Sequence, residues 1–215
     1  RYPDGGSIVQ DLFVYSQARF QLNKKVDFLL GGRWNNSKLS AKYNNPTFSF
    51  DDVKNNNTSF IKSVLISFKP ISNTNINATY YGGFRNPNID DIGKIFSKDD
   101  ISVVVPNADL YPEYADNFEL SVKYIISPLS IQIQLFKTLV SNAISREYGT
   151  VYGSDSMLYD GEMMRVQMNK NIERATIKGI GFSTNLNASN KFSIRTNCFD
   201  VIIKLLGKFV VVTSA

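Results

Sequence analysis

Residues 117–138, NFELSVKYIISPLSIQIQLFKT, decide the fold, because they hold two alternating segments joined by a turn of about three residues. Apolar side chains occupy every second position from Phe118 to Tyr124, and again from Leu129 to Leu135. The positions between them are polar. A period of two residues is typical of a β-strand with one apolar and one polar face, and a short turn makes the two strands antiparallel neighbours. The stretch therefore predicts a β-hairpin.

The same pattern recurs along the chain, with short turns on one side and long polar connections on the other. Strands are expected at about 10–22, 26–35, 58–70, 75–85, 117–124, 129–138 and 172–186, and from 191 onward. Short turns fall at 23–25, 71–73, 126–128 and 187–190, and long connections at roughly 35–57, 85–114 and 141–169. This asymmetry is typical of outer-membrane β-barrels, whose periplasmic turns are short and whose extracellular loops are long. It predicts an all-β fold, an antiparallel up-and-down transmembrane β-barrel segment of about eight strands.

Strand length and the positions of aromatic residues favour the barrel over a soluble β-sandwich, which alternation alone does not exclude. Each strand has about ten residues, enough to cross a bilayer at a tilt. Aromatic residues lie near strand ends, as in an interfacial girdle: Phe20, Trp34, Phe60, Phe68, Phe84 and Tyr124. The lysines on apolar faces, Lys62 and Lys137, both lie close to a long connection, so we expect no charge in the middle of an apolar face.

The composition excludes several classes of function. The formal net charge is +5, but Lys and Arg are scattered among Asp residues, so no nucleic-acid partner is expected. The chain has no histidine, which excludes a Ser-His-Asp or Cys-His nucleophile and a His-ligated metal from these residues. Cys198 is the single cysteine and cannot form an internal disulfide. We expect no enzyme activity, no cofactor and no metal site.

Three stretches carry ordered motifs: residues 80–96, YYGGFRNPNIDDIGKIF; residues 105–124, VPNADLYPEYADNFELSVKY; and residues 169–186, NKNIERATIKGIGFSTNL. They resemble the C-terminal half of the barrel in TonB-dependent outer-membrane receptors, especially those of Bacteroidetes. The matching residues are Gly83, Phe84, Arg85, Pro87, Asn88, Asp90 and Asp91 in the first; Asn107, Leu110, Pro112, Glu113, Asn117, Glu119 and Leu120 in the second; and Asn171, Ala175, Ile177 and Gly179 in the third. Gly181 departs from the pattern, because the family usually has Glu there.

The resemblance implies a barrel of roughly 22 strands with a plugged lumen in the outer membrane of a Gram-negative bacterium. It further implies active uptake of a scarce small extracellular ligand, such as an iron chelate, cobalamin or a glycan. The implied partners are outer-membrane lipid and the TonB energy-coupling complex, reached through a plug region that these strands do not supply. We therefore expect that this part of the barrel alone does not transport. The alternative is a non-transporting surface β-protein, an adhesin or a ligand-binding module; an outer-membrane hydrolase is disfavoured by the missing histidine.

The candidate ligand-binding residues are Arg85, Asn88, Asp90 and Asp91, where a predicted strand gives way to a loop. They could face an extracellular vestibule. The simpler interpretation is that they shape the rim, because Pro and Asn favour turns and Asp binds loop backbone. We expect that structural role, and no catalytic residue is predicted.

The end of the chain departs from the family pattern. Residues 200–212, DVIIKLLGKFVVV, show no alternation. The sequence therefore predicts two regions: residues 1–199, a partial TonB-dependent receptor barrel, and residues 200–215, a non-matching tail that arose by truncation or frameshift. A reading frame that continues through further homologous strands in the same isolate would contradict this interpretation.

Overall fold

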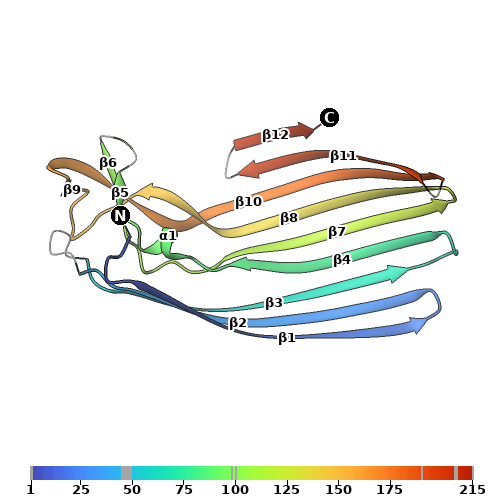
Figure 1. Cartoon of the computed structure of the whole chain (residues 1–215), viewed down its shortest axis with the longest axis horizontal. Coiled ribbons are helices and arrows are strands. Elements are labelled where there is room, and N and C mark those ends of the chain that lie inside the picture. The colour runs from blue at the N-terminus through green and yellow to red at the C-terminus, as the bar shows by residue number, and fades with distance from the viewer. Residues whose placement is uncertain are drawn as a thin grey trace.

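A computed structural model of the chain describes residues 2–44, 50–97, 99, 101–189, 191–205 and 208–214. Long antiparallel strands run side by side, with short turns at one end and long connections at the other (Figure 1). The strands are β1 (Ser7–Asn23), β2 (Val26–Ala41), β3 (Val53–Phe68), β4 (Thr74–Arg85), β5 (Phe96–Ser97), β6 (Ser102–Val105), β7 (Glu113–Ile126), β8 (Leu129–Tyr148), β9 (Ser156–Tyr159), β10 (Glu162–Ser189), β11 (Phe192–Leu205) and β12 (Lys208–Ser214). The described helix is α1 (Ile89–Ile92), and no helix among the described residues is long and apolar enough to span a membrane.

The main strands follow one another around the sheet in chain order, β1-β2-β3-β4-β7-β8-β10-β11-β12. Every pair along this path is antiparallel, which confirms the predicted up-and-down arrangement. The hairpin that opened the sequence analysis is β7–β8, in which Leu120 pairs with Leu135. The four predicted short turns connect β1 to β2, β3 to β4, β7 to β8 and β10 to β11. In the fourth of them, Asn190 lies outside the described residues.

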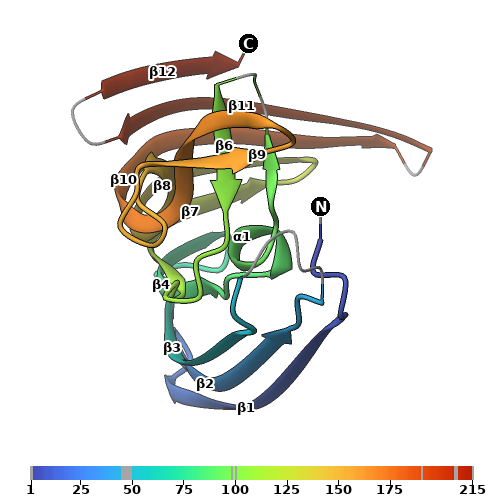
Figure 2. The same ribbon diagram turned by 90° about the vertical axis from the view of Figure 1, so that its left-hand side faces the viewer.

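The sheet curves into an arc, and the two faces of each strand differ in polarity. Figure 2 shows α1 and the short strands β5 and β6 on the concave side of this arc. On the convex side, Leu120, Leu135 and Ile180 form one cross-strand row and are 45%, 48% and 45% exposed. Large apolar side chains arranged in continuous rows on an exposed face are unfavourable in water and match a lipid-facing barrel wall. The convex face is therefore the outer face, and the concave face lines the lumen.

Several strands extend well beyond the predicted ends, so the predicted extents of the long connections at 35–57 and 141–169 are wrong, whereas the connection predicted at 85–114 is confirmed between β4 and β7. β2 continues to Ala41, β8 to Tyr148, and β10 already begins at Glu162. These extensions are rich in Asn, Ser and charged residues, and they lie beyond the length needed to cross a bilayer. No lipid-facing apolar row is needed there, so the alternation on which the prediction depended is weak.

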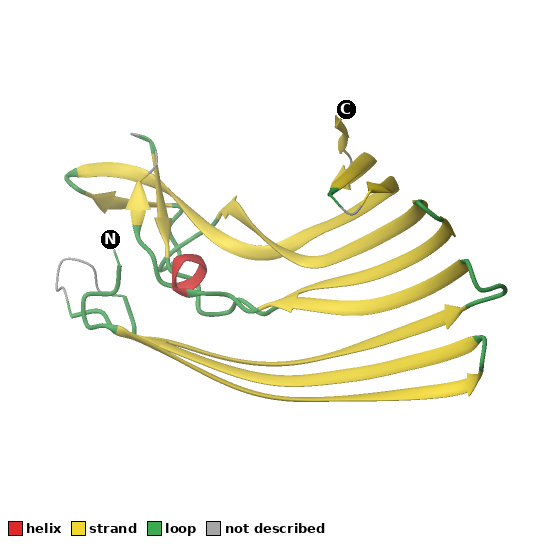
Figure 3. Cartoon of the chain, turned by 45° about the vertical axis from the view of Figure 1, so that its right-hand side comes forward, coloured by secondary structure: helices red, strands yellow, loops and turns green. Residues whose placement is uncertain are grey.

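The long connections fold together instead of hanging free as loops. β6 pairs in parallel with the start of β10, Ser102 opposite Arg165, while β5 pairs with β6 and β9 with β10. One cluster of buried side chains lies within these connections: Ile95, Val103, Val105, Tyr159, Met164 and Val166. A second cluster joins Ile92 and Leu110 to the ends of β2 and β3: Leu39, Ala41, Val53, Ile92 and Leu110. We call residues 86–112 and 149–168 the loop assembly. It has an apolar core of its own at the loop end of the arc, where Figure 3 shows the helix in red.

The face pattern changes near the end of β11. Up to Asn197 the inner face of this strand carries polar residues, but Phe199, Val201 and Ile203 then occupy inner positions. Asp200 falls on the outer face opposite Ile180, and Lys178 lies on the outer face of β10. The expectation that no charge occupies the middle of an apolar face is therefore wrong for Asp200. The strand predicted from 191 onward was not extended to this position because residues 200–212 show no alternation, whereas β11 continues to Leu205 and pairs with β12.

Candidate functional site

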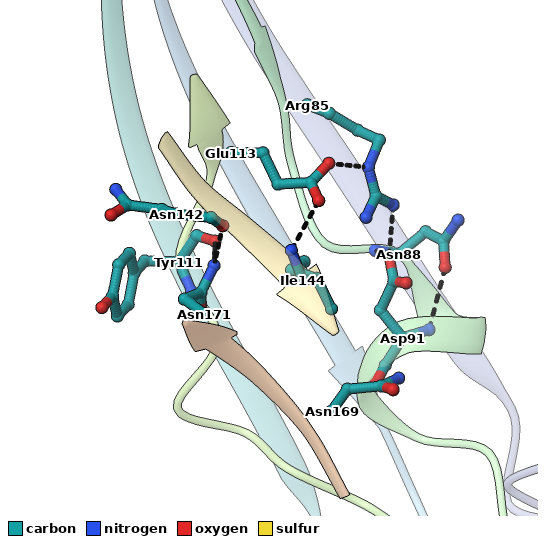
Figure 4. Close-up of polar contacts among 9 residues, drawn as sticks. All are labelled: Arg85, Asn88, Asp91, Tyr111, Glu113, Asn142, Ile144, Asn169 and Asn171. Atoms are coloured by element: carbon teal, nitrogen blue, oxygen red, sulfur yellow. Dashed lines mark hydrogen bonds and ion pairs between the residues drawn. The ribbon is translucent and has the colours of Figure 1, made fainter. Parts of the chain in front are cut away.

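The candidate site begins where β4 ends, at Arg85, and continues into the single turn of α1. Asn88 caps this helix: its side chain accepts a hydrogen bond from the Asp91 backbone N–H at 3.0 Å. In return, the Asp91 carboxylate accepts from the Asn88 backbone N–H at 3.0 Å. This reciprocal capping box satisfies two helix-end donors and fixes the first turn (Figure 4). The predicted turn-forming role of Asn88 and Asp91 thus has a defined geometry.

Arg85 joins the helix to the start of the next long strand. Its guanidinium donates to Asp91 Oδ2 at 2.6 Å through Nη1 and to Glu113 Oε2 through Nε. The hydrogen bond to Glu113 raises the pKa of Arg85, and the hydrogen bond to Asp91 adds to this effect against partial burial. One cation therefore holds two carboxylates that are 28 residues and 6 residues away in the chain.

Glu113 also fixes the neighbouring strand β8, because its Oε1 accepts from the Ile144 backbone N–H at 2.7 Å. Burial raises the pKa of Glu113, but the hydrogen bonds from Arg85 and Ile144 outweigh this effect, and the net pKa is lowered. The carboxylate is thus the ionised form near neutral pH. Its role here is to accept hydrogen bonds.

Asparagine side chains connect the loop assembly to β8 and β10. Asn171 uses its whole amide: its Nδ2 donates to Tyr111 O at 2.7 Å and Asn142 O at 2.8 Å, and its Oδ1 accepts from Tyr111 N at 3.0 Å. Asn107 donates to Asn169 O at 2.8 Å, and Asn169 donates to Asp91 O at 2.8 Å. Each amide satisfies backbone groups that no strand ladder reaches. The three motif stretches of the sequence are therefore in direct contact with one another.

The inner wall of the arc is attached to the same segment. Asn55 on β3 donates to Ala108 O at 2.9 Å and to Leu110 O at 2.7 Å, and Asn57 donates to Asn55 at 2.5 Å. Both asparagines are buried, although they lie in a strand stretch of repeated Asn residues. These hydrogen bonds hold residues 108–110 against the lumen side of β3.

The structure brings three of the four predicted residues together and separates the fourth. Arg85, Asn88 and Asp91 share one network, whereas Asp90 points away from it, accepting from Tyr2 OH at 2.8 Å and lying 3.5 Å from Lys94 Nζ. This geometry matches the expected rim-shaping role; whether any of the four binds ligand stays a prediction. Glu113, Asn107 and Asn171 were predicted only as motif matches, without a role. Their shared presence in three motifs of fixed spacing was the signal that they act together.

A second group of residues at the loop end has the character of a binding surface. Lys94 Nζ lies 4.9 Å from the ring centroid of Tyr2 and 5.3 Å from that of Phe96, and Arg146 lies 4.9 Å from Phe96. Sequence analysis missed this cation–aromatic cluster, because its members come from separate segments without a motif. Among the described residues, no group of three or more His, Cys, Asp or Glu side chains gathers to hold a metal ion.

Comparisons with known proteins agree with this architecture. A family model described as "TonB dependent receptor-like, beta-barrel" matches residues 2–207. The Haemophilus influenzae protein "Probable hemoglobin and hemoglobin-haptoglobin-binding protein 4" is 26% identical over 127 residues, which are 56% of this chain and 12% of that protein.

Solved structures with the same fold include the alcaligin outer-membrane receptor FauA of Bordetella pertussis, with 16% identity, a TM-score of 0.65, and coverage of 96% of this chain and 32% of that one. The ferric yersiniabactin uptake receptor FyuA of Yersinia pestis is 17% identical, with a TM-score of 0.65 and coverage of 94% of this chain and 28% of that one. The pyoverdine receptor FpvA of Pseudomonas aeruginosa is 19% identical, with a TM-score of 0.67 and coverage of 95% of this chain and 26% of that one.

This chain spans a third or less of each of these relatives. The resemblance to Bacteroidetes receptors in particular stays a prediction. The family model covers nearly the whole sequence, and the hairpin order, lipid-facing rows and folded loops are those of a barrel wall. The chain therefore belongs to the β-barrel family of TonB-dependent outer-membrane receptors.

Proposed function

We propose that this chain is part of the wall of an outer-membrane transporter that takes up a scarce extracellular ligand with energy supplied through TonB. The match to the receptor barrel over residues 2–207 carries the proposal. The loop assembly supports it, because a network-stabilised surface at the extracellular end gives a ligand a fixed geometry to recognise. Three relatives are named as receptors for alcaligin, ferric yersiniabactin and pyoverdine, and the fourth as a probable haemoglobin- and haemoglobin–haptoglobin-binding protein.

Among such ligands, we favour an anionic iron chelate over cobalamin or a glycan. Lys94 and Arg146 flank the Phe96 ring and offer two cations beside an aromatic face. Cations attract carboxylate and phenolate oxygens, which are the metal-binding groups of such a chelate. A neutral glycan would use the aromatic ring but gain nothing from the cations.

Transport requires more than the strands described. In the part of the chain that the structure describes, β1 and β12 each pair with one neighbour, and an open strand edge is not tolerated in lipid. We propose that further strands close the barrel and that a plug region within the lumen contacts TonB. Saturable uptake by liposomes that contain this chain alone would contradict the proposal.

The deciding experiment is uptake of radiolabelled iron chelates by cells that express the intact outer-membrane protein carrying this chain and lack their other iron receptors. We expect saturable uptake of at least one anionic chelate, abolished by deletion of TonB.

The double variant K94E/R146E should raise the concentration for half-maximal uptake by about tenfold or more, because it reverses both charges at the ring. The variant K24E in a short turn is the matched control and should transport normally. Uptake that is independent of TonB, or no uptake of any ligand in the panel, would contradict the proposed function.

A further inference from the structure

The barrel wall divides between β3 and β4 towards its loop end. β3 pairs with β2 along its whole length, from Val53 to Phe68, and β4 pairs with β7 as far as Arg85. Among the described residues, however, β3 pairs with β4 only from Ser63 to Phe68. Ladder hydrogen bonds hold neighbouring strands together, so the two strands form a fork beyond Ser63. On one side of this fork stand β1–β3, and on the other stand the later strands and the loop assembly.

The fork lies close to the extracellular membrane surface and beyond it. Ser63 is about eight residues from the short turn at Ile71, and a tilted strand needs about 9–11 residues to cross a bilayer. Short turns are periplasmic in this fold. Unpaired strand edges are not tolerated in lipid, but water satisfies their backbone groups outside it. A change in the width of the fork therefore exposes no backbone to hydrocarbon.

Side-chain contacts close the fork in place of a strand ladder. We call residues 107–112 the latch segment. Asn55 on β3 donates to its carbonyl oxygens at Ala108 and Leu110, at 2.9 Å and 2.7 Å. Asn57 on the same strand reaches the Leu110 oxygen at 3.5 Å. Two amides thus hold the latch segment across the fork.

The latch segment is attached independently to the opposite side of the fork. Asn107 donates to Asn169 O of β10 at 2.8 Å, and its backbone N–H donates to Ile92 O of α1 at 2.9 Å. Tyr111 uses both of its backbone groups to bind Asn171 of β10. These bonds stay intact when the contacts to β3 break, so the latch segment moves with the loop assembly.

The contact across the fork also includes apolar and aromatic groups. The Tyr43 hydroxyl donates to the Gly93 carbonyl, and the Arg33 guanidinium lies 5.5 Å from the ring centroid of Phe84. An apolar cluster joins two residues of the loop assembly to three at the ends of β2 and β3: Ile92 and Leu110 with Leu39, Ala41 and Val53. A partly polar interface of this kind permits relative motion of the parts that it joins.

Closure of the fork leaves a buried donor without a protein partner. The Tyr114 hydroxyl of β7 donates to Ser59 Oγ of β3 at 3.3 Å across the fork. Asn35 lies opposite Ser59 in the ladder and is 2% exposed, and its Nδ2 has no hydrogen-bond partner among the described residues. Water satisfies such a group, and it reaches Asn35 when Tyr114 moves away. This unpaired amide therefore favours the open fork.

A cavity of about 280 Å³ lies where the fork begins. Its lining includes residues of three strands: Ile61, Lys62 and Ser63 of β3, Gly82 of β4, and Gly31 and Gly32 of β2. Three of these residues are glycines, so little side-chain packing opposes rotation here. Small residues often absorb the change in backbone angles at a hinge. The base of the fork is therefore suited to act as a hinge.

We propose that the fork between β3 and β4 is a lateral gate: the latch segment releases Asn55 and Asn57, and the loop assembly swings away from β3 about the base of the fork. In the closed arrangement, α1, β5 and β6 occupy the concave side at the loop end (Figure 2) and narrow the way into the lumen. The open gate provides a side entrance just above the membrane. This role as an entrance rests on the proposed transport function, whereas the opening itself does not.

Spin-label distances test the opening in the intact outer-membrane protein carrying this chain, in micelles and in a Cys198→Ser background. Labels at K54C and D109C replace exposed residues on opposite sides of the fork. We expect a shorter and a longer distance. The variant N55A/N57A should raise the ratio of the longer to the shorter population by about fivefold or more, since each lost hydrogen bond shifts an equilibrium by roughly that factor.

The variant N36A is the matched control, because Asn36 binds Asn56 and Thr58 on β3 instead of the latch segment. It should leave the distances unchanged. The single variant N57A removes the longer contact and should give a smaller shift in the same direction as N55A/N57A. Heat-modified migration in gel electrophoresis shows whether each variant retains a folded barrel. One narrow distance that both latch variants leave unchanged would overturn the proposal.

Cross-linking tests the entrance. The variant N55C/A108C, also in the Cys198→Ser background, places one thiol on each side of the fork, and a short cleavable bifunctional reagent joins them. We expect the linked protein to bind radiolabelled iron chelate but to lose uptake, and cleavage of the linker to restore it. The variant K38C/N56C joins direct neighbours on β2 and β3 and should transport normally when linked.

The two experiments separate the gate from the proposed function. Uptake that persists in linked N55C/A108C would overturn the fork as an entrance. Absence of uptake by both the linked and the cleaved protein would contradict the proposed transport function instead, and the spin-label distances would then decide whether the gate opens.

Discussion

At the scale of single residues, one arginine and a few asparagine amides bind carboxylates and backbone groups that the strand ladders leave unpaired. Arg85 contacts a helix carboxylate and a strand carboxylate, and Glu113 passes this constraint to β8 through Ile144. Ion pairs on a protein surface usually contribute little, but bonds that share one cation and also satisfy a backbone N–H restrict several segments together. Arg85 and Glu113 therefore matter more for the geometry of the rim than for global stability.

Glu113 makes the rim sensitive to acid. Its pKa is lowered below the ordinary 4.5, so the stabilisation is fully present above that pH and is lost as the pH falls through the lowered value. We expect Glu113→Gln to reduce protection of the Ile144 amide from hydrogen exchange at pH 7 by about 1 kcal/mol or less, because Gln can still accept that bond but is neutral. At pH 3 the two proteins should converge. Equal protection at pH 7 would show that the charge has no role.

A substitution at Gly179 tests how closely the side chains of the inner wall are packed. A Cβ at this position would lie 2.4 Å from Phe136 Cζ and 2.6 Å from the carbonyl oxygen of Asp200. We expect Gly179→Ala to destabilise the barrel by about 1–3 kcal/mol, measured as a shift of the urea midpoint in micelles. Gly83→Ala is the matched control, because its nearest atoms would be 3.9 Å away and belong to Ala115. Similar midpoints for the two variants would exclude close packing as the reason for glycine at 179.

At the scale of elements, the sequence predicted the parts that face lipid and missed those that face only water. The strands from β1 to β11 along the main path were found because lipid demands an apolar residue at every second position. The strands β5, β6 and β9 have two to four residues each and are stabilised by contacts distant in sequence, such as Ser102 with Arg165. No local pattern encodes such a pairing. The contacts of Asn171 were unpredictable for the same reason, although its motif marked the position.

Asn171 on β10 holds the loop assembly through Tyr111 and also binds Asn142 on β8. We expect Asn171→Ala to loosen this assembly by about 1–3 kcal/mol, because three hydrogen bonds to the backbone of Tyr111 and Asn142 are lost. Hydrogen exchange should rise at Tyr111 and across β6, while the membrane strands keep their protection. As a control, Asn197→Ala removes an exposed inner-face amide. An increase in exchange confined to residue 171 would refute this connecting role.

At the scale of the whole molecule, the arc has two chemically different ends. The end with short turns has little structure beyond the membrane, whereas the loop end carries α1, the short strands and both buried clusters. The inward apolar residues at 199–203 interrupt the polarity of the wall, while the family match continues to residue 207; a different origin for residues 200–215 stays a prediction. Further homologous strands in frame would contradict it.

The orientation of the arc is directly testable with single cysteines in a Cys198→Ser background. In intact cells, Met163→Cys should react with a membrane-impermeant maleimide, because Met163 is 68% exposed at the loop end. Lys24→Cys should react only after the outer membrane is permeabilised, since short turns are periplasmic. The opposite labelling pattern would invert the topology.

The parallel pairing of β6 with β10 has a consequence for immune recognition. Because Ser102–Val105 and Arg165–Met168 form one ladder, the loop end of the native protein is assembled from segments about 60 residues apart. Antibodies raised against the native cell surface should therefore recognise discontinuous epitopes. Sera against linear peptides from residues 86–112 would bind the denatured chain and fail on living bacteria.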